Sequence, residues 1–136
     1  MRLQLALNVP DLDTAIDFYS KMFATAPQKV EPGYANFAVN DPPLKLVLFE
    51  TETAGDSINH LGVESFDNDD VLAAGERLTA ANLPIRVEEE VTCCYANSNK
   101  VWVESPDGIA WEWYKVLSDA DSMGETGVPE NIGCCQ

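Results

Sequence analysis

Residues 2–27 read RLQLALNVPDLDTAIDFYSKMFATAP, and residues 58–84 read INHLGVESFDNDDVLAAGERLTAANLP. Each stretch begins with a short run in which apolar residues alternate with small or polar ones, which is typical of a β-strand. Each then passes a residue suited to cap a helix, Asp11 in the first stretch and Asp67 or Asn68 in the second. An amphipathic helix and a proline follow in both. The chain therefore contains an internal repeat.

Three strand candidates follow each helix, separated by turns that contain Gly or Pro. They lie at 28–30, 34–39 and 44–50 in the first half, and at 85–91, 100–104 and 109–116 in the second. The element order βαβββ thus occurs twice, which predicts an α+β fold of tandem βαβββ modules. We expect a single domain over 1–117, with modules at about 1–52 and 57–117. The small, polar and acidic residues 118–136 predict a flexible tail that ends in Cys-Cys.

Composition narrows the possible partners. The net charge of −15, from 23 acidic and 8 basic residues, disfavours nucleic acid and anionic membranes as partners. The sequence has no apolar run long enough for a transmembrane helix, and its start lacks the features of a signal peptide. We therefore expect a cytoplasmic protein with no membrane partner.

The four cysteines form two adjacent pairs, Cys93–Cys94 and Cys134–Cys135. Neighbouring residues lie about 3.8 Å apart at Cα, closer than a relaxed disulfide prefers, and disulfides are rare in the cytoplasm. Adjacent thiolates suit one soft ion, whereas buried thiols can also act as small hydrophobic groups. Two pairs in one chain favour soft-ion binding. We expect the Cys93–Cys94 segment to be a loop between two strands.

Three polar residues occupy related positions of the repeat. Aligning the opening strands places Gln4 opposite His60, the only histidine, and Glu112 lies on the last strand between two tryptophans. An unpaired buried carboxylate is costly, so Glu112 needs either a metal or a Lys or Arg partner. Its counterpart in the first half is Val47, which cannot bind a metal. If the halves pack with pseudo-two-fold symmetry, Gln4, His60 and Glu112 converge.

These features resemble a known family. The tandem βαβββ order over residues 1–116, with FYSKMF at 18–23 and SPDGIAWEWY at 105–114, resembles the vicinal oxygen chelate superfamily of glyoxalases, bleomycin-resistance proteins and extradiol dioxygenases. Within it, NHLGV, TCCYA, NKVWV and the terminal Cys-Cys resemble the organoarsenical carbon–arsenic lyases, a family that overlaps with cadmium-induced proteins. One position departs from that pattern, because Asn99 stands where we expect Asp.

The resemblance implies an Fe(II)-dependent dioxygenase, with O2 as co-substrate, that cleaves the C–As bond of methyl and aromatic trivalent organoarsenicals to give arsenite. It also implies Gln4, His60 and Glu112 as iron ligands and Cys93 with Cys94 as the arsenical-binding pair. Three protein ligands leave metal positions open for O2 and substrate. The auxiliary thiols Cys134 and Cys135 are expected either to deliver the arsenical or to scavenge it.

Other interpretations remain open. The same fold could carry a protein that only sequesters Cd(II) or As(III) through its thiols. Another enzyme of the superfamily would leave the Cys93–Cys94 pair unexplained. The superfamily builds its barrel within one chain or across two, so a homodimer is compatible with the sequence.

Overall fold

The computed structural model describes residues 1–52, 57–93 and 95–119. Within these ranges the order β-α-β-β-β occurs twice, which confirms the predicted fold. The elements are β1 (Arg2–Val9), α1 (Leu12–Met22), β2 (Lys29–Glu31), β3 (Tyr34–Val39), β4 (Leu44–Glu50), β5 (Ile58–Glu64), α2 (Asn68–Ala80), β6 (Ile85–Cys93), β7 (Ala96–Glu104) and β8 (Ala110–Asp119). The chain divides into an N-terminal unit, residues 2–59, and a C-terminal unit that begins at His60.

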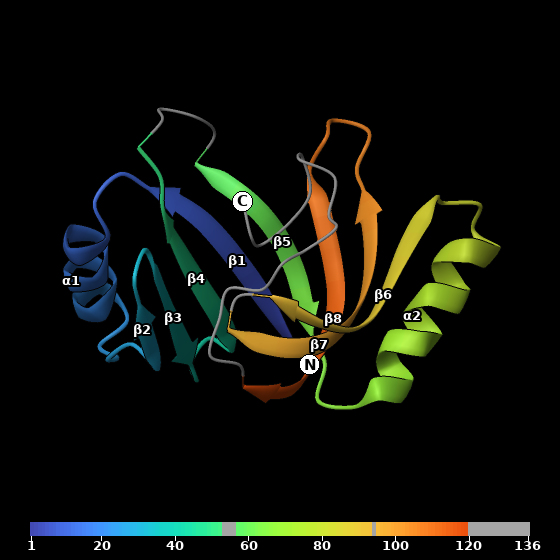
Figure 1. Cartoon of the computed structure of the whole chain (residues 1–136), viewed down its shortest axis with the longest axis horizontal. Coiled ribbons are helices and arrows are strands. Elements are labelled where there is room, and N and C mark those ends of the chain that lie inside the picture. The colour runs from blue at the N-terminus through green and yellow to red at the C-terminus, as the bar shows by residue number, and fades with distance from the viewer. Residues whose placement is uncertain (53–56, 94, 120–136) are drawn as a thin grey trace. The chain divides into compact units, whose positions relative to one another are not determined.

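In the N-terminal unit the strands lie in the order β2-β3-β4-β1. β1 is parallel to β4, and the other pairs are antiparallel. Helix α1 covers one face of this sheet (Figure 1) and buries Leu12 against Phe37, Leu46 and their neighbours. The helix begins where predicted, since the Asp11 carboxylate accepts a hydrogen bond from the Thr14 amide at 3.0 Å.

In the C-terminal unit the strands lie in the order β5-β8-β7-β6, with β5 parallel to β8. Helix α2 packs beside β6, β7 and β8 (Figure 1), where Val71 and Leu78 meet Val101. Of the two predicted caps, Asp67 is the one used, and its carboxylate accepts from the Asp69 amide at 2.9 Å. The helix ends at Ala80, and the following residue, Ala81, is exposed.

Strand alternation decides which side chains are buried on the functional strands. On β1, Gln4 and Ala6 are 5% and 0% exposed, whereas Leu3 is 57% exposed. On β8, Ala110, Glu112 and Tyr114 are all buried, as their shared face predicts. The polar face of each strand is therefore an interior face, where a site can be built.

The hairpin between β6 and β7 is longer than predicted. Strand β6 reaches Cys93, and β7 begins at Ala96, so the prediction of a loop at Cys93 was wrong at that residue. Cys93 pairs with Ala96 around a turn in which Tyr95 has a φ of 61°. Strand β8 likewise runs beyond residue 117, to Asp119. The grouping of both units as one domain stays a prediction.

Among the described residues, neither helix has the length and apolar character needed to cross a membrane.

Candidate metal centre and active site

His60 and Glu112 lie together in the interior of the C-terminal unit. β5 and β8 are parallel, and Gly62 is the register partner of Glu112. His60 lies on the same face of β5 as Gly62, because side chains alternate along a strand. His60 Nε2 approaches Glu112 Oε1 to 3.3 Å, and the side chains are only 1% and 2% exposed. The structure thus brings together two of the three predicted ligands.

Lys100 holds the second oxygen of Glu112. Its Nζ donates to Glu112 Oε2 at 3.0 Å, and the lysine is 4% exposed. The ammonium also lies 5.6 Å from the Trp102 ring centroid and 5.7 Å from that of Tyr114. The sequence required a metal, Lys or Arg partner for Glu112, and the structure supplies lysine from the neighbouring strand. The identity of that lysine was missed, because it depends on the register of β7 against β8.

The charges around Glu112 keep its carboxyl group ionised. Burial is the largest influence and raises the pKa, but the Lys100 ammonium and then His60, with their hydrogen bonds, outweigh it. Together they lower the pKa of Glu112 to about 2. The side chain is therefore a carboxylate at neutral pH, which is the form that binds a metal ion.

The pair fits a divalent metal ion. Two ligand atoms that lie about 2.1 Å from one ion and at right angles are about 3.0 Å apart, close to the 3.3 Å between Nε2 and Oε1. Coordination by Oε1 leaves Oε2 free to keep its hydrogen bond to Lys100, as carboxylate ligands commonly do. In the parts of the chain that the structure describes, no group of three His, Cys, Asp or Glu side chains is placed to hold a metal. The third predicted ligand, Gln4, is an amide.

Gln4 and Val47 occupy the corresponding slots of the N-terminal unit. Gln4 is buried on β1, and Val47 pairs with Ala6, two residues further along that strand. In the C-terminal unit Glu112 pairs with Gly62, which lies two residues beyond His60. Val47 is therefore the counterpart of Glu112, and a fourth metal ligand is missing from that slot. The convergence of Gln4 with His60 and Glu112 stays a prediction.

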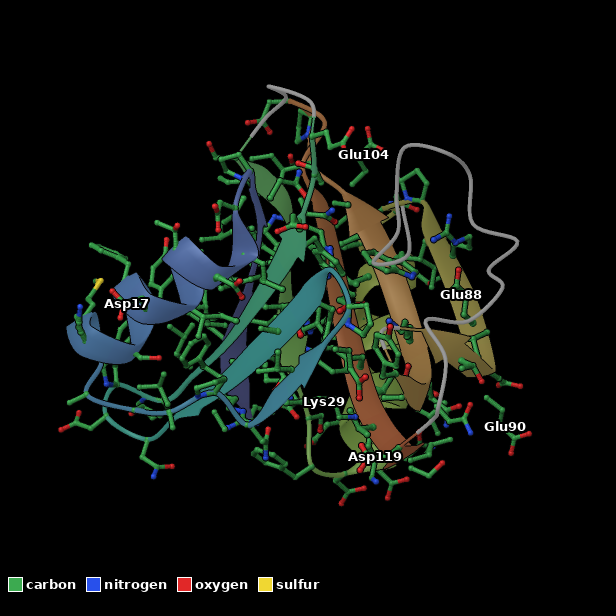
Figure 2. All side chains as sticks on the ribbon, turned by 60° about the vertical axis from the view of Figure 1, so that its left-hand side comes forward. Asp17, Lys29, Glu88, Glu90, Glu104 and Asp119 are labelled. Atoms are coloured by element: carbon green, nitrogen blue, oxygen red, sulfur yellow. The ribbon has the colours of Figure 1, made fainter. Side chains whose placement is uncertain are left out.

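Only the backbone of Cys93, of the four predicted thiol residues, lies within the described part of the chain. Cys93 is the last residue of β6, whereas Cys94, Cys134 and Cys135 lie outside the described residues. The hairpin has a register shift between Glu88 and Val91, and Glu90 has a φ of 52°. Figure 2 shows Glu88 beside β6 and Glu90 pointing away from the ribbon. The shift bends β6 before it reaches the cysteine.

Asn99 holds the bent part of the hairpin through two hydrogen bonds. The sequence predicted no structural role for this residue. Its Oδ1 accepts from the Glu90 amide at 2.8 Å, and its Nδ2 donates to Asn68 Oδ1 at 2.8 Å. Asn68 is the first residue of α2. The position at which the sequence departs from the expected Asp thus ties the bent hairpin to the helix.

Comparison with known proteins agrees with the fold. Residues 3–113 match the family model described as the Glyoxalase/Bleomycin resistance protein/Dioxygenase superfamily. The Mn(II)-bound glyoxalase from Novosphingobium aromaticivorans superposes with a TM-score of 0.63 and 17% identity, over 93% of this chain and 41% of that one.

Two curated relatives are about half identical to the chain. The trivalent organoarsenical cleaving enzyme of Thermomonospora curvata is 49% identical over 98% of this chain and 87% of its own. The cadmium-induced protein CadI of Mycobacterium tuberculosis is 49% identical over 98% of this chain and 92% of its own. Both alignments therefore extend through the two units and the hairpin.

Proposed function

Because the chain belongs to the Glyoxalase/Bleomycin resistance protein/Dioxygenase superfamily, we propose that it is an enzyme that cleaves the C–As bond of trivalent organoarsenicals in arsenic detoxification. The identity of 49% to a trivalent organoarsenical cleaving enzyme supports the substrate class. The observation that carries the proposal within this chain is the buried contact between His60 Nε2 and Glu112 Oε1 at 3.3 Å. Two metal-binding groups in such a contact suit a metal-dependent reaction.

We propose Gln4, His60 and Glu112 as the ligands of Fe(II). The iron, when bound, would supply the activation of O2, the oxidant that the cleavage requires. Glu112 is the one anionic ligand of the three, and Lys100 keeps its carboxylate ionised and oriented. The neutral amide of Gln4 is a weak donor, so we expect the metal to be held loosely and to be lost easily on purification.

Cys93 and Cys94 would hold the arsenic as a dithiolate. Trivalent arsenic with one organic substituent has two positions left for sulfur, and adjacent thiolates converge on one soft atom. Tethering the substrate in this way converts a collision into an intramolecular step. The products would be arsenite and an oxidised organic fragment. Cys134 and Cys135 would capture the arsenical before transfer.

The test is anaerobic reconstitution with Fe(II), followed by addition of air and methylarsonous acid and by speciation of the arsenic. The proposal requires catalytic release of arsenite together with consumption of O2. Cys93→Ser and Cys94→Ser should each abolish this release while iron still binds. Full turnover by either variant would rule out the dithiolate.

A second candidate is sequestration of Cd(II) or As(III) by the thiols on the same fold. The identity of 49% to a cadmium-induced protein favours it. A sequestering protein would bind the ion stoichiometrically and would consume no O2 in the same experiment. The two functions therefore separate in a single measurement.

A further inference from the structure

The imidazole of His60 is in contact with a large ring from β7. Trp102 on this strand is the register partner of Glu112, and both side chains lie on the interior face with His60. The Trp102 ring meets the imidazole edge-on, with 5.4 Å between the ring centroids and an angle of 69° between the planes. Trp102 is 3% exposed and His60 is 1% exposed. The indole therefore limits rotation of the imidazole inside the unit.

A histidine ligand needs such support, because its own side chain sets the ring orientation only weakly. Rotation about χ2 of a histidine has a broad, roughly two-fold profile, so rotamer preference does not lock the imidazole. The contact of His60 with Glu112 is made by Nε2, the atom that would hold the metal. A neighbour other than Glu112 must therefore fix the ring once the metal is bound.

The indole of Trp102 is itself held by three charged groups. Its Nε1 donates a hydrogen bond to Glu88 Oε2 at 3.3 Å. The Arg86 guanidinium and the Lys100 ammonium each lie 5.6 Å from the ring centroid, a distance at which a cation is attracted to an aromatic face. Glu88 Oε1 lies 3.1 Å from Arg86 Nη2. One carboxylate thus holds both the indole and a cation beside it.

Glu88 connects this support to the β6–β7 hairpin. The residue, labelled in Figure 2, lies on β6, the strand that ends at Cys93. It forms a regular pair with Lys100, and the register shift begins directly after it. The carboxylate that holds the indole therefore lies where the bent part of the hairpin starts.

We propose that Trp102 is a positioning residue that fixes the imidazole of His60 for metal binding, and that Glu88 holds the indole in place. The inference deepens the proposed function and rests on it, since it takes His60 as a metal ligand. The indole restricts rotation of the imidazole, and the hydrogen bond from Nε1 to Glu88 restricts movement of the indole. The strand that carries Cys93 thus also supports a proposed metal ligand.

The first test observes the imidazole directly, because His60 is the only histidine of the chain. In the full chain, metal-free and labelled with 15N-histidine, proton–nitrogen NMR spectra report this one ring without metal or turnover. The wild-type chain should give one sharp set of ring signals. Trp102→Leu should give broadened signals or several sets, because the imidazole samples more than one orientation. Trp102→Phe keeps an aromatic ring but has no N–H for Glu88, and its spectrum should fall between the two.

The affinity for Mn(II) measures the consequence for the metal site. Mn(II) prefers oxygen and nitrogen ligands to thiolates, so EPR titration with this metal alone avoids the cysteines. Trp102→Leu should weaken Mn(II) binding by about 10- to 100-fold, and Trp102→Phe should recover most of the affinity. Glu88→Gln should cause a smaller loss, because an amide has one acceptor oxygen for the two groups that the carboxylate meets, Trp102 Nε1 and the Arg86 guanidinium.

Trp113→Leu is the matched control. Trp113 lies on β8 and packs against the cluster of Val71, Leu78 and Val101, on the face of the sheet that α2 covers. The same truncation at this position should destabilise the fold but should leave the His60 spectrum and the Mn(II) affinity unchanged. Thermal unfolding compares the stability of the two leucine variants.

The outcomes separate positioning from a general effect on stability. Wild-type His60 signals in Trp102→Leu overturn the proposal, and so do equal changes in Trp102→Leu and Trp113→Leu. Where Trp102→Leu does not fold, Trp102→Phe decides, since wild-type line widths and wild-type Mn(II) affinity in that variant also overturn it. If His60 loses its single orientation in Trp102→Leu but the wild-type chain binds no Mn(II), the positioning role stands and the proposed metal site fails.

Discussion

The two units share one arrangement of strands and use it for different purposes. Equivalent register positions hold Val47 in the N-terminal unit and Glu112 in the C-terminal unit. The neighbouring slots differ in the same direction, with neutral or apolar groups in the first unit and charged or large aromatic groups in the second. These pairs are Tyr34 and Lys100, and Asn36 and Trp102. At these positions the first unit buries neutral side chains, whereas the second unit buries the charged pair of Lys100 and Glu112.

The hairpins show a second difference. In the N-terminal unit β2 has 3 residues and turns at Gly33, whose φ is +70°. In the C-terminal unit β6 has 9 residues and ends at Cys93. The two modules therefore differ most in the hairpin that carries Cys93, one of the two cysteines predicted to bind the arsenical.

The largest effect is expected when the two equivalent residues, Glu112 and Val47, are each replaced by alanine. Glu112→Ala should abolish metal binding and arsenite release, and should destabilise the fold by about 3–5 kcal/mol because it leaves Lys100 buried and unpaired. Val47→Ala should cost about 1–3 kcal/mol through the cavity alone and should retain the metal. Metal content and urea unfolding measure both. If Val47→Ala lost the metal as completely as Glu112→Ala, the division of labour between the units would be wrong.

Acid should weaken the C-terminal unit through Glu112. Its pKa in the folded chain is about 2, below the usual value of 4.5 for a glutamate side chain. A lowered carboxyl pKa contributes stability above the unfolded value, and this stability is lost as pH falls from about 4.5 towards 2. The contribution is roughly 3 kcal/mol. The difference in unfolding free energy between wild type and Glu112→Gln should shrink over this range, and a constant difference would show that Glu112 is not held ionised.

Removing the lysine should weaken the metal site without removing a ligand. In Lys100→Met the carboxylate loses the hydrogen bond at 3.0 Å, burial raises the pKa of Glu112, and metal affinity should fall by about 10- to 100-fold. The loss should be greatest at low pH, where a proton competes with the metal. Anaerobic Fe(II) titration at several pH values measures the effect. Tyr34→Phe, in the equivalent slot of the other unit, is the control and should bind Fe(II) as wild type does.

The bend in the long hairpin should depend on Asn99. Asn99→Ala removes the hydrogen bonds to the Glu90 amide and to Asn68, and should cost about 1–2 kcal/mol. Hydrogen exchange at the Glu90 amide should accelerate more than exchange in β8. Asn99→Asp keeps an acceptor for Glu90, and a rotated Asn68 amide can donate to it, so this variant should remain close to wild type. If hydrogen exchange at the Glu90 amide accelerated equally in Asn99→Ala and Asn99→Asp, an acceptor oxygen at position 99 would not be what holds the bend.

The sequence predicted the parts of the molecule that depend on local periodicity. The strands Tyr34–Val39 and Leu44–Glu50 and the cap at Asp11 have the predicted bounds, because alternation and capping are read from neighbouring residues. Alignment of the repeat placed Gln4 opposite His60 and Val47 opposite Glu112, and the convergence of His60 with Glu112 was predicted for halves that pack with pseudo-two-fold symmetry. The structure shows the contact between His60 and Glu112. Repeat alignment is therefore as informative as periodicity when two halves share one topology.

The missed residues lie on the hairpin, where register cannot be read from the sequence. Lys100 lies beside Glu112 because of the regular part of the β7–β8 register, in which Trp102 is opposite Glu112. The register shifts lie nearer the hairpin tip, between Glu88 and Val91 and between Asn97 and Ser98. Each shift changes which residues are opposite one another without leaving a composition signal. The predicted strands ended too early because Thr92 and Asn97 are polar and were read as part of a loop. In the structure their side chains hydrogen-bond to each other across the hairpin.

The smallest effect on the unfolding free energy is expected at an ion pair on the protein surface. Asp17 and Lys21 on α1 form an ion pair at 2.8 Å, but their side chains are 67% and 76% exposed (Figure 2 shows Asp17). Solvent screens such a pair, so Asp17→Asn should change the unfolding free energy by less than about 0.5 kcal/mol. Urea unfolding at low and high salt measures it, and the small difference should vanish at high salt. Because the Lys100–Glu112 pair is buried, its contribution to the unfolding free energy should persist at the same salt concentration. If the two ion pairs were equally sensitive to salt, burial would not distinguish them.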